Sequence, residues 1–182
     1  APESWEDTVN WARAKSFDLD LMEESGLVAN RDGKRYGRFR GRLMFPINDE
    51  QGRVIGFSGR VLEAEVKAAK YVNSPESLIY YKSKILYGIY FAKQHISKQN
   101  NCFIVEGYTD VISLHQAGVE NVVSSSGTSL TSEQIKLINR FTKNITILFD
   151  GDAAGLKCNC DRIQRGEAWG ELYGERVRFV RM

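Results

Sequence analysis

Two short apolar runs in the second half of the chain each end in acidic residues. Residues 102–105 lead directly into Glu106, and residues 145–149 lead into Asp150 and Asp152. Short runs rich in β-branched and aromatic residues predict buried strands, and the helical patterns between these two runs predict that the strands are parallel. Because the carboxyl ends of parallel strands lie at one edge of a sheet, where α/β proteins bind ligands, we expect the three acids to gather there.

Three carboxylates at such an edge would repel one another unless a cation neutralised them. Hard oxygen ligands suit Mg²⁺ or Mn²⁺, so the pattern predicts a divalent-metal site that handles phosphate. A further acid, Asp110, falls in the first turn of the helix predicted after Glu106. Residues 126–129, Ser-Gly-Thr-Ser, form a small-residue loop that can offer backbone N–H groups to phosphate. Each cluster alone also fits a structural role, as a helix-capping acid or an Asp-Gly turn, and only their joint occurrence favours a site.

Charge is unevenly distributed along the 182 residues, although the formal net charge is only +2. Residues 1–30 carry 2 basic and 7 acidic side chains, whereas residues 31–60 carry 8 basic and 3 acidic ones. A basic block beside an acidic metal site is suited to a nucleic-acid partner, because lysine and arginine displace the counterions of a polyanion. A solvated basic surface without a partner is the alternative that charge alone leaves open.

Composition excludes several other classes of protein. Hydrophobic residues make up 42% and charged residues 26% of the chain, as in globular proteins, and no apolar run approaches the roughly 20 residues of a membrane span, so we expect no membrane partner. The 3 cysteines and 2 histidines lack the spacing of a zinc site and predict a protein of a reducing compartment. Because the chain starts at Ala1, we expect it to be a fragment of a longer protein.

Hydrophobic periodicity predicts two parts that meet near residue 100. The first part, residues 1–100, is expected to contain short helices, a β-hairpin and a loop-rich stretch, and the second, residues 101–182, repeated strand–helix units. The expected helices cover residues 5–14, 18–25, 86–96, 109–117, 132–141 and a stretch from about 153. The expected strands cover residues 43–47, 54–57, 102–105, 122–124, 145–149 and 176–180, and residues 63–84 are expected to be rich in loop. Gly26 is placed to end the second helix, and Thr131 and Gln134 have the spacing of a capping box.

The order of three motifs in the second part resembles the Toprim domain, which primases, topoisomerases and some nucleases share. The motifs are a strand followed by Glu106-Gly107-x-x-Asp110, the loop 126–129, and a strand followed by residues 150–155, Asp-Gly-Asp-Ala-Ala-Gly. The first part narrows the resemblance, because its motifs follow the order seen in the RNA polymerase core of the bacterial replicative DNA primase. These motifs lie at residues 39–47, 52–57, 59–60, 70–71, 73–76, 82 and 86–88. The resemblance covers roughly residues 5–157, and so many motifs in one order seldom arise by chance.

The resemblance implies an α/β fold, with a Toprim-type parallel sheet flanked by helices and preceded by part of a smaller basic α+β subdomain. It implies a DNA-directed RNA polymerase that makes short RNA primers for replication on single-stranded DNA from ribonucleoside triphosphates, by metal-dependent nucleotidyl transfer. The acids implied to hold Mg²⁺ or Mn²⁺ are Glu106, Asp110, Asp150 and Asp152, of which Glu106, Asp150 and Asp152 are implied to be catalytic. The residues implied to face template or nucleotide are Arg40, Arg42, Arg60, Lys70, Asn73 and Lys82.

The resemblance also carries implications about the rest of such a protein. Primases of this type bind the replicative helicase and zinc through domains that this sequence does not include, and they act at the replication fork, in the nucleoid of the bacterial cytoplasm. A further acidic loop follows the closing strand in the family, whereas this sequence ends at Met182, so we expect the fragment to bind metal and nucleotide weakly and to make little primer. Two alternatives remain open: another Toprim enzyme, such as a topoisomerase or nuclease, and a non-catalytic nucleic-acid-binding module.

Overall fold

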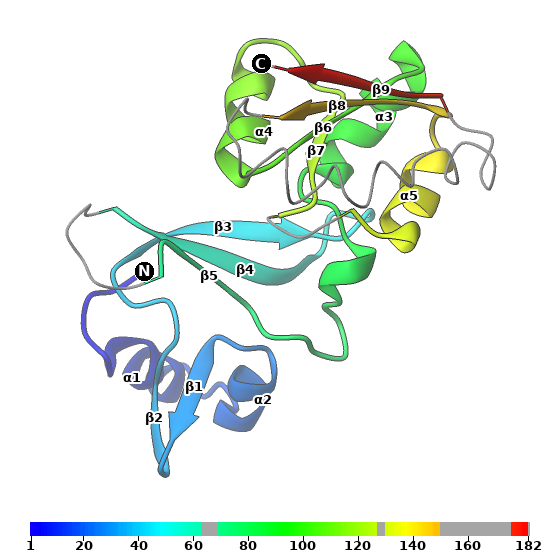
Figure 1. Cartoon of the computed structure of the whole chain (residues 1–182). Helices are drawn as coiled ribbons and strands as arrows, with labels where there is room; N and C mark the ends of the chain where they lie inside the picture. Colours follow the sequence, from blue (N-terminus) through cyan, green and yellow to red (C-terminus); the bar gives the residue numbers. More distant parts are fainter. Residues whose placement is uncertain (63–68, 127–129, 150–175, 182) are drawn as a thin grey trace. The chain divides into compact units, whose positions relative to one another are not determined.

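The computed structural model describes residues 1–62, 69–126, 130–149 and 176–181. The chain falls into two compact units, whose elements are drawn in Figure 1. The first unit comprises Ala1–Ile47 and Arg53–Tyr81, and the second comprises Asn48–Gly52 and Lys82–Met182. The turn Asn48–Gly52 therefore belongs to the second unit, although the strands that it joins lie mainly in the first.

The first unit begins with two helices and a small hairpin. α1 covers Asp7–Ala14, α2 covers Leu19–Glu24, β1 covers Val28–Arg31 and β2 covers Lys34–Gly37. Asp18 caps α2, because its Oδ1 atom accepts a hydrogen bond from the N–H of Asp20 at 2.7 Å. Gly26 ends the turn after α2 with a φ of +74°, as predicted. Four buried side chains join these elements into a small core: Val9, Ala12, Met22 and Val28.

The β1–β2 hairpin was not among the elements predicted from the sequence. Its two-residue loop is Asp32-Gly33, and both residues have positive φ angles, of +53° and +78°. Asp-Gly at this spacing is a strong hairpin signal. The flanking strands, however, bury only Val28 and Gly37, so they show no alternation of apolar and polar residues. The sequence therefore contains the Asp-Gly signal of a tight turn, but the flanking residues lack the alternation of apolar and polar side chains that predicts strands.

A second sheet of the first unit has the strand order β3-β4-β5, with β3 at Arg42–Asn48, β4 at Val54–Val61 and β5 at Tyr71–Asn73. The expected pairing of residues 43–47 with 54–57 is confirmed, because β3 and β4 are hydrogen-bonded neighbours. β5 is a short strand, not predicted from the sequence, within the stretch 63–84 that was expected to be rich in loop, and it pairs antiparallel with β4. A strand of 3 residues is too short to give a period-2 signal in the sequence.

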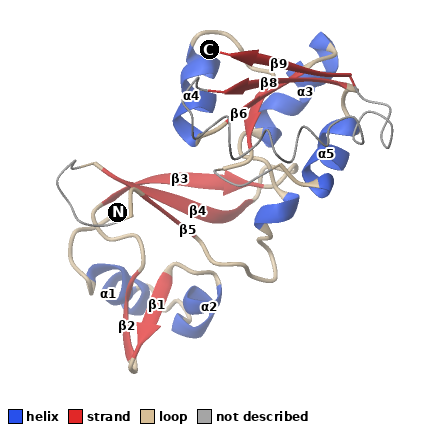
Figure 2. Cartoon of the chain, in the orientation of Figure 1, coloured by secondary structure: helices blue, strands red, loops and turns tan. Residues whose placement is uncertain are grey.

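The second unit is built on a parallel sheet with the strand order β7-β6-β8-β9, of which β6, β8 and β9 are labelled in Figure 2. Its strands are β6 (Cys102–Val105), β7 (Val122–Ser124), β8 (Asn144–Phe149) and β9 (Arg176–Arg181). The described helices are α3 (Ile89–Gln99), α4 (Tyr108–Gln116) and α5 (Ser132–Asn139), and a 3₁₀ turn, η1, covers Lys82–Lys84. The strands are parallel as predicted, whereas the helix expected from about residue 153 lies outside the described residues.

Helices cover both faces of this sheet. Ile104 on β6 belongs to a buried cluster with Ile96 of α3 and Ile138 of α5. Its neighbour Val105 belongs to another cluster, with Val111 of α4. Because successive side chains of a strand point to opposite faces, α3 and α5 cover one face and α4 covers the other. A parallel sheet buried on both faces explains why its strands are continuous apolar runs in the sequence.

Two helix starts test the predicted boundaries. The capping box of α5 is confirmed: the N–H of Gln134 donates to Oγ1 of Thr131 at 3.2 Å, and the N–H of Thr131 donates to Oε1 of Gln134 at 3.0 Å. α3 begins at Ile89 instead of residue 86, because Tyr87 forms an isolated bridge with Ser124 of β7. Within the described ranges, no helix has both the length and the apolar character that crossing a membrane requires.

Candidate active site and nucleic-acid interface

The two strands that precede the acidic motifs in the sequence, β6 and β8, are parallel neighbours in the sheet of the second unit. β6 pairs with β7 on one side and with β8 on the other, and Glu106 directly follows β6. Ile104 lies opposite Ile147 of β8, and two further steps in this register place Glu106 beside the last residue of β8. Asp150 and Asp152 follow that residue in the sequence, and both lie outside the described residues.

Hydrogen bonds connect the end of β7 to Glu106. Oγ of Ser124 donates to the backbone carbonyl of Glu106 at 2.8 Å and accepts from the N–H of Ser126 at 2.9 Å. Ser126 has a φ of +61°, a left-handed conformation that is uncommon for serine and turns the chain sharply. The first residue of the Ser-Gly-Thr-Ser loop is thereby tied to the strand that carries Glu106, while residues 127–129 lie outside the described ranges.

Asp110 lies in the first turn of α4, close to the end of β6. Its Oδ2 atom accepts a hydrogen bond from the N–H of Gly107 at 2.9 Å, which caps the helix. A Cβ atom at Gly107 would lie 3.2 Å from this oxygen, which is closer than most real Cβ contacts. Glycine at this position therefore lets the carboxylate of Asp110 approach the backbone directly after Glu106.

Glu106 and Asp110 do not make a metal site by themselves. In residues 1–62, 69–126, 130–149 and 176–181, no group of three or more His, Cys, Asp or Glu side chains is arranged to hold a metal ion. Because Asp150 and Asp152 lie outside these ranges, the assembly of the four predicted acids stays a prediction. The carboxylates of Glu106 and Asp110 are the hard oxygen donors that Mg²⁺ and Mn²⁺ prefer.

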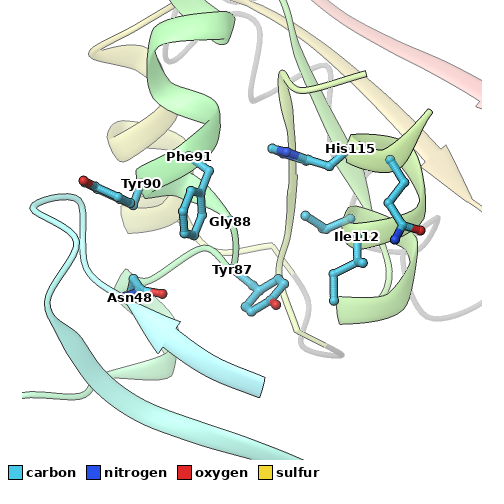
Figure 3. Close-up of a pocket in the computed structure, with 9 residues that line it drawn as sticks. Asn48, Tyr87, Gly88, Tyr90, Phe91, Ile112 and His115 are labelled. Carbon is cyan, nitrogen blue, oxygen red and sulfur yellow. The ribbon is translucent and has the colours of Figure 1, made fainter. Parts of the chain in front are cut away.

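A cavity of about 220 Å³ lies beside α4 in the second unit (Figure 3). Tyr87, Phe91, Ile112 and His115 are among the residues that line it. Tyr87 also packs edge-to-face on Tyr108, the first residue of α4, with ring centroids 4.7 Å apart. Burial raises the pKa of Tyr87 and lowers the pKa of His115. The sequence did not single out this cavity, because its lining residues have the helical spacing of ordinary core residues.

Three of the predicted nucleic-acid residues lie together on the β4–β5 part of the first unit. Arg60 and Asn73 share one face, because Asn73 lies opposite Ser58, two residues before Arg60 on β4. The guanidinium of Arg60 lies 5.7 Å from the ring centroid of Tyr71, its partner on β5. Lys70 is exposed and directly precedes β5. Arg60 and Asn73 therefore share a face of the β4–β5 pair, and Lys70 lies in the chain just before β5.

Arg42 lies in the same sheet but on its other face. Its Nη1 atom donates to the backbone carbonyls of Gly59, Ala69 and Lys70, at 3.1, 2.9 and 3.3 Å. A Cβ atom on Gly59 would lie 3.0 Å from Cδ of Arg42, and Gly59 alternates with Arg60 along β4, so Arg42 packs opposite Arg60. Burial lowers the pKa of Arg42. These contacts give Arg42 a structural role in holding β3 against the chain that follows β4.

Arg40 stacks on an aromatic side chain that the sequence patterns did not single out. Its guanidinium lies 4.2 Å from the ring centroid of Trp5, which is 53% exposed. Trp5 packs edge-on against Tyr36 with centroids 5.1 Å apart, and Nη1 of Arg40 donates to the carbonyl of Glu3 at 3.3 Å. An exposed tryptophan beside an arginine is suited to stacking on a nucleic-acid base. The only sequence feature that could have indicated this stacking surface was a tryptophan, Trp5, among polar residues near the start of the chain.

Lys82 lies in the second unit, whereas the other predicted nucleic-acid residues lie in the first. It begins η1, and its backbone carbonyl accepts a hydrogen bond from Nε2 of Gln134 at 3.0 Å. The same amide donates to the carbonyl of Ile85 at 2.8 Å, and the side chain of Gln134 is fully buried. A buried amide on α5 thus fixes the backbone that carries Lys82.

The described elements define an α/β domain with Glu106 and Asp110 at the end of one strand, preceded by a unit with its own small sheets. Residues 1–93 match the family described as DNA primase catalytic core, N-terminal domain, and residues 103–168 match the family described as Toprim-like. The Toprim-like family is generally metal-dependent. The chain belongs to the DNA primase family. The family and the fold class inferred from the motifs are thereby confirmed.

Individual relatives agree with this assignment. The chain is 47% identical over 162 residues to the DNA primase of Synechococcus elongatus, covering 86% of this chain and 23% of the relative. It is similar to the crystal structure of the RNA polymerase domain of the Mycobacterium tuberculosis primase, with a TM-score of 0.87 and 32% identity, covering 100% of this chain and 60% of that one. A DnaG primase catalytic domain bound to single-stranded DNA is also similar, with a TM-score of 0.81 and 38% identity, covering 100% and 58%. The chain spans between about a quarter and a third of the length of the curated relatives it matches.

Proposed function

We propose that this chain is part of a primase catalytic core, which joins ribonucleotides into short RNA primers on a single-stranded DNA template. The observation that carries the proposal is the parallel pairing of β6 with β8 in a member of the DNA primase family. Glu106 follows β6 and Asp150 follows β8 in the sequence, so parallel pairing of the two strands would bring both acids to one edge of the sheet. The family matches to residues 1–93 and 103–168 support a division into two family domains near residue 100.

The acids that would hold Mg²⁺ or Mn²⁺ at this edge are Glu106, Asp110, Asp150 and Asp152. Glu106 and Asp110, the two of these acids that the structure describes, offer the carboxylate oxygens that such a cation prefers. The hydrogen bond from the N–H of Gly107 holds the carboxylate of Asp110 beside the end of β6, and the absence of a Cβ atom at Gly107 leaves room for it. A divalent cation bound there would neutralise the triphosphate and the charge that develops at the transferring phosphorus. Glu106, Asp150 and Asp152 would be catalytic residues through their contact with that cation.

The chain that follows β7 would orient the phosphate groups of the nucleotide. Ser124 and Ser126 hold the start of this segment against the end of β6 by hydrogen bonds. The segment leads into α5, which begins at Ser132, and backbone N–H groups before a helix attract anions. Phosphate bound there would lie on the same edge of the sheet as Glu106.

Basic residues of both units would contact the template or the incoming nucleotide. Arg60, Lys70 and Asn73 would do so from the first unit, and Lys82 from the second. Arg40 would add a cation next to Trp5, whose ring offers a stacking surface. A similar primase domain is described as bound to single-stranded DNA, which supports a nucleic-acid partner for this chain.

Arg42 would act less directly than the other basic residues. Its three hydrogen bonds to backbone carbonyls position the chain that carries Lys70, the residue just before β5. A primase function would place the protein at the replication fork in the bacterial cytoplasm. The helicase partner and the zinc site concern parts of longer relatives beyond these 182 residues, and both stay predictions.

Two alternative functions have less support. A topoisomerase or a nuclease can share a Toprim-like domain, but the match of residues 1–93 to the N-terminal domain of the primase core favours a primase. A non-catalytic nucleic-acid-binding module would use the basic residues and would have no use for the acids. Metal binding at the acidic edge therefore distinguishes the proposed enzyme from such a module.

Manganese binding by the 182-residue chain tests the acidic edge. We expect electron paramagnetic resonance to show Mn²⁺ binding that weakens by about tenfold in Glu106→Gln and in Asp150→Asn, because each variant loses a ligand and a charge. Glu133→Gln is the matched control, since Glu133 is an exposed acid on α5 that pairs with Lys136. Equal Mn²⁺ affinity in all of these proteins would contradict the site. In the full-length protein, Glu106→Gln should abolish templated primer synthesis while single-stranded DNA binding persists.

A further inference from the structure

A tight turn between β5 and η1 carries apolar residues at its exposed tip. The backbone groups of Ser77 and Tyr80 form reciprocal hydrogen bonds of 3.0 and 3.3 Å. The two residues between them, Leu78 and Ile79, are 89% and 58% exposed. Turn positions of this kind usually hold glycine, proline, asparagine or aspartate, so the turn itself does not require leucine and isoleucine. Tyr80 is 2% exposed, which means that a buried anchor holds an apolar tip in solvent.

The tip and α2 line a groove of about 710 Å³ in the first unit. Leu21 of α2 is 62% exposed and Tyr81 is 43% exposed, and both side chains line the groove together with the tip. The chain after α2 touches the chain before the turn, because a Cβ atom on Gly26 would lie 2.2 Å from Cδ of Pro75. The two walls are therefore fixed to each other at this contact. Contiguous exposed apolar side chains on a soluble protein mark interaction surfaces.

Acidic side chains give the groove a negative charge. Glu24 and Glu76 are exposed and line it together with the apolar residues. Residues 1–30, which include α2, carry 7 acidic and 2 basic side chains. Asp20 and Glu23 of α2 form ion pairs with Arg35, whereas Glu24 follows them at the end of the helix. A surface of this charge repels phosphate groups and attracts lysine and arginine.

We propose that this groove binds an amphipathic segment of a separate protein, whose leucine-like side chains fill the groove and whose lysine or arginine side chains meet Glu24 and Glu76. Apolar anchors that enter a groove carry most of the affinity in such complexes, while charges on the rim set the choice of partner. Nucleic acid is not the occupant, because the two carboxylates repel its phosphates. The described residues that line the groove do not include Arg60, Lys70 or Asn73. Binding at the groove is therefore a property in addition to the proposed catalytic function.

Two synthetic helical peptides of equal length test the proposal, one made of leucine and lysine and the other of leucine and glutamate. Each carries a fluorophore whose anisotropy is followed during titration with the 182-residue chain. We expect only the leucine–lysine peptide to bind. Its affinity should be about tenfold weaker for Leu78→Ser/Ile79→Ser, which removes the apolar tip, and about threefold weaker for Glu24→Gln. The melting temperatures should match the wild type, because all three side chains are exposed.

Leu43→Ser is the matched control, because Leu43 is 47% exposed on β3 and is not among the described residues that line the groove. Unchanged affinity in Leu78→Ser/Ile79→Ser, or equal binding of the two peptides, would overturn the proposal. Sedimentation that shows dimers of the wild type but not of this double variant would also overturn it, by assigning the groove to a second copy of the chain. Binding of oligothymidylate that the double variant abolishes would assign the groove to nucleic acid and would overturn it too.

Discussion

The Oδ2 atom of Asp110 accepts a hydrogen bond from the N–H of Gly107 at 2.9 Å, so one carboxylate closes the first turn of α4 and lies beside the acidic end of β6. This acid has two separable properties, an oxygen that accepts a hydrogen bond and a negative charge. Asparagine keeps the first property and loses the second, whereas alanine loses both. The two variants therefore distinguish helix capping from metal binding at one position.

Asp110→Ala should lower the free energy of unfolding by about 1 kcal/mol, because the N–H of Gly107 loses its acceptor. Asp110→Asn should stay within about 0.5 kcal/mol of the wild type, since its side-chain oxygen can still cap the helix. Both variants should bind Mn²⁺ more weakly than the wild type. Urea unfolding and Mn²⁺ titration measure the two effects separately. Wild-type Mn²⁺ affinity in Asp110→Asn would show that Asp110 is a capping residue only.

Arg42→Ala should destabilise the β3-β4-β5 sheet by about 1 kcal/mol, because three backbone carbonyls lose their common donor. Thermal unfolding of the 182-residue chain measures the loss. The control is Arg31→Ala, since the side chain of Arg31 is 83% exposed and should contribute little to stability. Equal melting temperatures for the two variants would contradict the structural role of Arg42.

Alanine at Arg60, Lys70 and Lys82 together should weaken binding of single-stranded DNA and flatten its dependence on salt. The slope of the logarithm of affinity against the logarithm of salt concentration should fall by roughly 0.7 for each phosphate that a side chain no longer neutralises, because fewer counterions are released. Fluorescence anisotropy over a range of salt concentrations measures the slope. A variant with alanine at Lys98 and Lys143, which are exposed lysines of the second unit, should keep the wild-type slope. If the triple variant also keeps it, the three residues are solvated surface.

Stability should depend on pH through His115. Burial lowers the pKa of His115 below its usual 6.5, so the unfolded chain binds a proton more readily than the folded one. The stabilisation is complete above about pH 6.5 and is lost as the pH falls through the lower pKa of the folded state. His115→Gln should reduce this loss, which for one proton is at most about 1.4 kcal/mol per pH unit. Urea unfolding between pH 7 and pH 5 measures the loss, and an equal loss in His115→Gln and in the wild type would contradict this role of His115.

The sequence predicts the parallel sheet well, because strands that are buried on both faces are recognisable as runs of apolar residues. β6, β7 and β8 are continuous apolar runs, and helices with a clear period separate them. The strands of the first unit are harder to recognise in the sequence. β5 is too short to show a period, and β1 and β2 bury little more than Val28 and Gly37. The Asp32-Gly33 turn was the only strong local signal for that hairpin.

The candidate site was predictable where a local pattern determines position. Glu106 and Asp110 fall at a strand end and in the next helical turn, as expected from their spacing. The environment of Arg42 was not predictable in this way, because the carbonyls that it binds lie 17 to 28 positions later in the chain. The contact between Arg40 and Trp5 likewise joins distant segments. A pattern of residue types shows that a cation is present, but only the tertiary fold shows whether it supports the backbone or is open to a ligand.

The turn Asn48–Gly52 makes the two units inseparable along the chain. Nζ of Lys93 donates to the carbonyl of Glu50 at 2.6 Å, and Arg140 forms an ion pair with the carboxylate of Glu50 at 2.5 Å. All three residues belong to the second unit. A protein shortened to residues 82–182 would therefore lose Glu50 and leave two cations without this partner. A single cut of the chain therefore cannot separate the second unit with all of its residues, because the turn at residues 48–52 lies between β3 and β4.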